Sequence, residues 1–131
     1  MNLTAHRIVL TNAIATAASG VLMLAARAML YPYFGLGSPL LLDVIAIGFI
    51  AYAGVMAIAA RRPAMSRATL LALAAADVSW VVFSAGVLIV FWSALDPIGR
   101  ALIIAVALVV EVFATLQFAA ARRLPTRVSM A

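Results

Sequence analysis

The chain has 131 residues, of which 68% are hydrophobic and 10% are charged, and its mean hydropathy is +1.22. This composition is far more apolar than that of a soluble domain and predicts an integral membrane protein with a single domain over residues 1–131. The net charge of +5 comes from nine arginines and no lysine. Because these arginines cluster at the ends of apolar segments, we expect no nucleic acid partner.

Four apolar segments each have roughly the 20 residues that an α-helix needs to cross a bilayer. We predict membrane spans over residues 8–30, 40–60, 68–93 and 98–121, and we expect the first to be an uncleaved helix. The predicted fold class is all-α, a four-transmembrane-helix bundle of antiparallel up-down hairpins. The positive-inside rule predicts cytoplasmic termini and a multi-pass protein of the inner (plasma) membrane, because most arginines fall on one side: Arg7, Arg61, Arg62, Arg67, Arg122, Arg123 and Arg127.

The first span carries small residues and a charge near its outer end. Ala13, Ala17 and Gly20 recur at helical spacing, so helices can approach closely here, within the bundle or across a homodimer. Arg27 lies about one turn before the predicted helix end, and Asp43 lies about one turn into the second span. Since their depths match, we predict a structural ion pair that ties the first two spans together.

Three later helix starts are marked by local chemistry. Ser38 precedes Pro39, and Asp96 precedes Pro97, which is the pattern of an N-cap residue followed by proline at the first helical position. Ser66 can cap the third span in the same way. We therefore expect the second, third and fourth spans to begin at these residues.

Asp77 in the third span and Glu111 in the fourth are two of only four acidic residues. Asp77 lies ten residues after Arg67 and Glu111 lies eleven before Arg122, so both are roughly 15 Å inside the membrane. Charged groups in hydrocarbon are costly and persist where they bind, relay or pair. The two acids and the polar and aromatic side chains at similar depth predict one ligand-binding or proton-binding site: Asp77, Glu111, Tyr52, Thr16, Trp80 and Thr115.

The carboxylate pair has two interpretations. Two carboxylates close together in a medium of low dielectric cannot both ionise at low cost, so we expect Asp77 and Glu111 to share a proton. The pair would then form a proton-coupled or cation-binding site. Alternatively, a protonated acid bonded to nearby hydroxyl groups holds the helices together. The sequence leaves both interpretations open.

Other chemistry has little support in the chain. The absence of cysteine excludes disulfides and thiolate metal sites, and the only histidine, His6, has no second histidine or carboxylate near it in sequence. Motifs for a phosphate-binding loop or a serine nucleophile are missing. We therefore expect no metal, no cofactor and no enzymatic activity.

In size and number of spans the chain resembles the small multidrug resistance transporters, which use a membrane-embedded glutamate in the first helix. Here the first span offers Asn12 and Thr16 instead, so this resemblance concerns layout. The outer Gly35–Pro39 segment and the Asp77–Trp80 segment are similar to stretches of uncharacterised small four-helix bacterial integral membrane proteins. That resemblance implies the four-span topology, and it does not point to any particular activity.

The sequence favours a small membrane protein that binds or transports a proton, an organic cation or a small amphiphile through a polar layer at mid-membrane depth. The alternative is a non-catalytic accessory or scaffold subunit of a larger membrane complex. The expected surroundings are the lipid bilayer and either a second copy of the chain or a larger membrane complex.

Overall fold

The computed structural model describes residues 3–34 and 38–126, and within these ranges it contains five helices and no strand. The helices are α1 (Leu3–Ala25), α2 (Arg27–Phe34), α3 (Pro39–Ala60), α4 (Arg67–Val90) and α5 (Pro97–Arg123). All except α2 are long and apolar enough to cross a membrane. The all-helical fold class and the four long apolar helices are therefore confirmed. Gly35 and its two successors in the outer segment lie outside the described residues.

The long helices after the first begin as the local sequence predicts. Ser38 and Asp96 have extended backbones, and their side chains accept hydrogen bonds from the N–H groups two residues later. Ser66 accepts from Thr69 N at 3.0 Å. Each cap satisfies a backbone donor that has no partner within its own helix.

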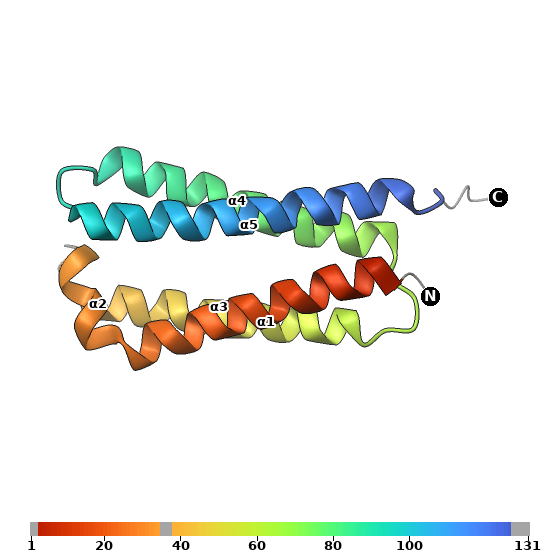
Figure 1. Cartoon of the computed structure of the whole chain (residues 1–131), viewed down its shortest axis with the longest axis horizontal. Helices are drawn as coiled ribbons and strands as arrows, with labels where there is room; N and C mark the ends of the chain where they lie inside the picture. Colours follow the sequence, from red (N-terminus) through yellow and green to blue (C-terminus); the bar gives the residue numbers. More distant parts are fainter. Residues whose placement is uncertain (1–2, 35–37, 127–131) are drawn as a thin grey trace.

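The first predicted span differs from the structure. The helix begins at Leu3 rather than residue 8 and ends at Ala25, after which Ala26 forms a turn and α2 takes a new direction across the end of the bundle (Figure 1). Here the carbonyl of Tyr33 accepts a hydrogen bond from Asp96 N at 3.2 Å. This contact with the start of α5 fixes α2 across the bundle end instead of in line with α1.

The helices form two hairpins, with α1 beside α3 and α4 beside α5 (Figure 1). The first turn of α1 and the last turn of α5 lie at the same end of the bundle. At this end the two hairpins share a core of buried side chains from all four long helices and the α3–α4 connection: Ala5, Val9, Ala13, Met56, Met65, Leu70, Leu73, Ala120 and Ala121. The packed core thus lies toward the termini, and the cavities described below lie farther along the bundle.

Within the first hairpin, α3 is held to α1 by a close approach and to the start of α2 by an ion pair. A Cβ atom on Gly20 would lie 2.8 Å from the carbonyl oxygen of Ala46, so the helix backbones are too close there for any larger residue. The ion pair predicted from the sequence is present, with Arg27 Nη1 3.1 Å from Asp43 Oδ2. The structure thereby fastens the hairpin both near its middle and near the α2 end.

Candidate functional site

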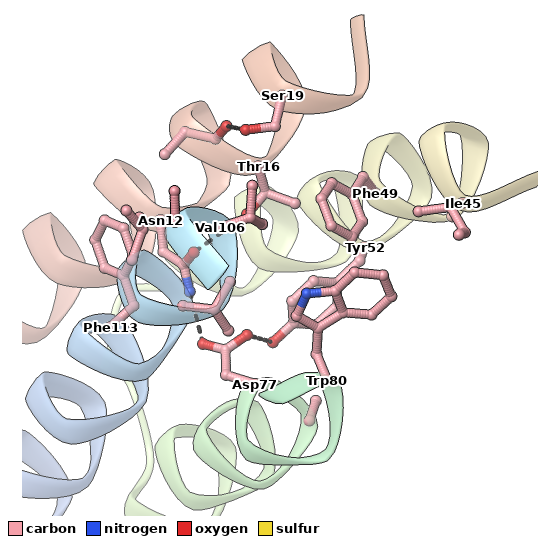
Figure 2. A pocket seen from close by; sticks show the side chains of 16 residues that line it. Asn12, Thr16, Ser19, Ile45, Phe49, Tyr52, Asp77, Trp80, Val106 and Phe113 are labelled. Atoms are coloured by element: carbon pink, nitrogen blue, oxygen red, sulfur yellow. Dashed lines mark hydrogen bonds between the residues drawn. The ribbon is translucent and has the colours of Figure 1, made fainter. Parts of the chain in front are cut away.

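Asp77 is the centre of a hydrogen-bonded network between the two hairpins. Asp77 belongs to α4 and is only 3% exposed, whereas the two side chains that donate hydrogen bonds to it come from the opposite hairpin. Asn12 Nδ2 on α1 donates to Asp77 Oδ2 at 2.8 Å, and the Tyr52 hydroxyl on α3 donates to Asp77 Oδ1 at 3.0 Å (Figure 2). Both carboxyl oxygens therefore have a neutral donor.

The network extends beyond these two contacts. Thr16 Oγ1 donates to Asn12 Oδ1 at 3.2 Å, which orients the amide so that its nitrogen faces Asp77. The Tyr52 hydroxyl also lies 3.2 Å from the carbonyl oxygen of Leu73, a second acceptor. With two acceptors available, this hydroxyl can donate to an ionised Asp77. It can also donate to Leu73 O while a protonated Asp77 donates to the tyrosine oxygen. The geometry thus accommodates either protonation state of the carboxyl.

A cavity of about 440 Å³ lies beside Asp77 and is lined by all four long helices. Its size is within the range of small-molecule binding sites. Its polar side chains include Asn12, Thr16, Ser19, Tyr52 and Asp77 (Figure 2). The remaining lining is mostly apolar, and among the described residues Asp77 supplies the only carboxyl group in the wall.

Aromatic rings form one side of this cavity. The rings of Phe49 and Trp80 line it and meet edge to face with centroids 4.7 Å apart, and Phe83, which is not part of this wall, packs against Trp80 at 5.5 Å. In Figure 2, Ile45, Phe49 and Trp80 lie together on the side away from Phe113. Trp80 Nε1 is buried and has no hydrogen-bond partner among the described residues.

The structure divides the site residues predicted from the sequence into two groups. Asp77, Tyr52, Thr16 and Trp80 all line the cavity. Glu111 and Thr115 are exposed and are not part of its wall.

The expected pairing of Asp77 with Glu111 is therefore wrong. The α5 side chains that face the cavity include Val106, Val110 and Phe113. Successive residues of a helix are rotated by about 100°, so Glu111 falls on nearly the opposite side of α5 from these residues. Equal depth in the membrane brought the two carboxyl groups to one level but not to one face.

Two amide side chains belong to the polar layer and were not among the predicted site residues. Asn12 is 1% exposed and bonds Asp77 directly. Gln117 is completely buried near Asp77, although neither of its amide atoms has a hydrogen-bond partner of good geometry. Counted depth would not have grouped them with Asp77, because Asn12 and Gln117 lie five residues from Arg7 and Arg122, whereas Asp77 lies ten from Arg67. The available signal was the presence of amide side chains inside apolar segments.

The described residues include no group of three or more His, Cys, Asp or Glu side chains that could hold a metal ion. The chemistry of the site is that of a single buried carboxyl group, neutral hydrogen-bond donors and aromatic rings around a cavity. Comparisons of the chain with protein-family models, curated proteins and solved structures find no match.

Proposed function

We propose that this chain spans the plasma membrane as two antiparallel hairpins with both termini in the cytoplasm, and that it binds organic cations or protons at Asp77 for transport. The observation that carries the proposal is a buried carboxyl group in the wall of a 440 Å³ cavity, hydrogen-bonded only to neutral donors. The ion pair among the described residues joins Arg27 and Asp43, so no arginine there neutralises Asp77.

A cation is the ligand that the cavity suits best. A carboxylate at mid-membrane depth is costly unless a positive charge or a proton neutralises it. The rings of Trp80, Phe49 and Tyr52 in the cavity wall can add favourable contacts for an organic cation, because the face of an aromatic ring attracts positive charge and desolvation strengthens the attraction. A proton and a cation would compete for the same carboxyl group, which provides a basis for exchange of one for the other.

The position of Asp77 between the hairpins connects binding to movement. Its hydrogen bonds to Asn12 and Tyr52 cross from one hairpin to the other. A bound cation would compete with these donors for the carboxyl oxygens and weaken the connection. Because a ligand shifts a conformational equilibrium only through differential affinity, this competition supplies a physical route to alternating states.

The test is binding of tetramethylammonium to the full chain in phosphatidylcholine nanodiscs. Asp77→Asn should weaken binding at least about 30-fold, as expected when one partner of a desolvated charge pair is removed. Glu111→Gln is the matched control, because it removes a membrane-embedded carboxyl group on the opposite face of α5 and should leave binding unchanged. Equal binding by the wild type and Asp77→Asn would overturn the proposal. In proteoliposomes, Asp77→Asn should also abolish cation-driven proton flux.

A specific observation favours a second function as an accessory subunit. Glu111 is exposed at mid-membrane depth together with Thr115, one turn along the same face of α5. Polar groups at this depth usually face protein rather than lipid. A partner helix that donates hydrogen bonds to Glu111 would cover this face. Purification in mild detergent should then recover a stoichiometric partner that Glu111→Gln releases, whereas a monodisperse single chain would contradict this function.

A further inference from the structure

A second cavity, of about 180 Å³, adjoins the first toward the α2 end of the bundle. Ile45, Phe49, Trp80 and Val106 line both cavities, so the two spaces meet at the aromatic side of the Asp77 site. The far wall includes Leu30, Tyr31 and Phe34 of α2, which lies across this end of the bundle. The space therefore extends from the carboxyl group toward α2 and ends there.

The second cavity differs from the first in its chemistry. Among the described residues its wall has no charged side chain, and besides Tyr31 it has two serines whose hydroxyls are already bonded. Ser84 Oγ donates to the carbonyl of Trp80 at 2.9 Å, and Ser38 Oγ accepts from Leu40 N. An occupant would consequently meet hydrocarbon and aromatic surface, which suits an apolar group.

We propose that the two cavities together bind a single-chain cationic amphiphile, with its charged head at Asp77 and its alkyl tail in the second cavity. This inference rests on the proposed function at Asp77 and specifies the class of cation. The second cavity is smaller than the first, about 180 Å³ against about 440 Å³, so the tail that we assign to it is short, and a hexyl chain serves as the probe.

The experiment compares two cations that differ only in the tail. Binding of tritiated tetramethylammonium and hexyltrimethylammonium is measured in phosphatidylcholine nanodiscs, with partitioning into protein-free nanodiscs subtracted. Val87→Phe fills the second cavity, because Val87 lines the second cavity and does not line the first. Ile89→Phe is the matched control, because Ile89 on the same helix is 80% exposed. Ile103→Phe repeats the test from α5.

We expect Val87→Phe and Ile103→Phe to weaken hexyltrimethylammonium roughly tenfold or more, within the range that overpacking causes, and to leave tetramethylammonium unchanged. Retained tetramethylammonium binding also shows that the variants fold. The Ile89→Phe control should bind both cations normally. In a Trp92→Phe background, Trp80 is the only tryptophan and reports on its surroundings by fluorescence. A bromine at the end of the hexyl tail should quench Trp80 emission, and the quenching should be weaker when Val87→Phe is added.

The outcomes separate this inference from the proposed function. If both cavity-filling variants bind hexyltrimethylammonium as the wild type does, the tail lies in lipid or elsewhere, and the tail assignment is wrong while the Asp77 site stands. If they weaken both cations equally, the second cavity does not distinguish the tail from the head, which also overturns the assignment. If neither cation depends on Asp77, the proposed function fails and this inference fails with it.

Discussion

The hydroxyl of Tyr52 is the most direct test of the network between the hairpins. Tyr52→Phe keeps the ring but removes the donor that lies 3.0 Å from Asp77 Oδ1 and 3.2 Å from Leu73 O. The Leu73 carbonyl keeps its place in the helical hydrogen-bond pattern of α4, whereas Asp77 Oδ1 loses its donor. The cost of the substitution should therefore come mainly from Asp77.

Hydrogen bonds between membrane helices contribute about 0.6 kcal/mol on average and at most about 1.7 kcal/mol. Because Asp77 is only 3% exposed, we expect the loss in free energy of unfolding to lie in the upper part of this range, at about 1–1.5 kcal/mol. Reversible unfolding in mixed micelles measures it. Tyr33→Phe is the control, because the Tyr33 hydroxyl has no hydrogen bond among the described residues, and it should change stability by less than about 0.5 kcal/mol.

A double-mutant cycle with Asp77→Leu isolates the interaction. If the hydroxyl acts through Asp77, Tyr52→Phe should cost little in the Asp77→Leu background, because the carboxyl acceptor has gone. The expected coupling is at least about 0.6 kcal/mol. An equal loss of stability in both backgrounds would show that the hydroxyl acts through another group and would refute the reasoning.

Three further pairs of substitutions test other contacts. Gly20→Ala should destabilise the chain by about 1–3 kcal/mol through overpacking, whereas Gly54→Ala, where a Cβ meets open space, should be neutral or stabilising in the same micelle unfolding assay; equal effects would contradict the close approach. Arg27→Met should lower the melting temperature in detergent more than Asp43→Asn, because it leaves an 18% exposed carboxylate unpaired while the 50% exposed arginine can reach water; the reverse order would contradict this. For tetramethylammonium binding, Trp80→Phe should keep most of the affinity, while Trp80→Leu should weaken it about 2-fold to 30-fold; equal weakening by both would argue against contact with the ring face.

The sequence was sufficient to predict features that depend on local chemistry or on counting. The three helix caps follow from side chains that satisfy donors within two or three residues. The ion pair of Arg27 with Asp43 follows from matching depths at the ends of neighbouring helices, where long side chains reach across a range of helix rotations. Depth also placed Asp77 in a layer with Tyr52 and Thr16.

Features that depend on helix rotation could not be predicted in the same way. The depth of Glu111 was estimated from its distance to the arginines, but its direction depends on which face of α5 packs inward. In α5 apolar residues surround the helix, so the sequence pattern does not mark the inner face clearly. The packing of Ala114 and Gln117 against the other helices decides the rotation, and Glu111 consequently faces outward.

The break at Ala26 has a similar origin. The residues from 8 to 30 form one apolar segment by composition, so hydropathy predicts a single helix. The change of direction depends on a contact between the Tyr33 carbonyl and Asp96, which are 63 residues apart in the chain. Such a contact leaves no trace in local sequence patterns.

The location of Asp77 also affects how the two hairpins find their correct vertical alignment during assembly. In lipid, alanine-rich and leucine-rich helix surfaces have little preference for one alignment over another, because the surrounding hydrocarbon is equally apolar. A slide of one helical turn, about 5.4 Å, would carry Asp77 away from Asn12 and Tyr52 and leave its carboxyl group without donors. The network therefore selects one alignment, and hairpins expressed as separate chains should associate in that alignment alone.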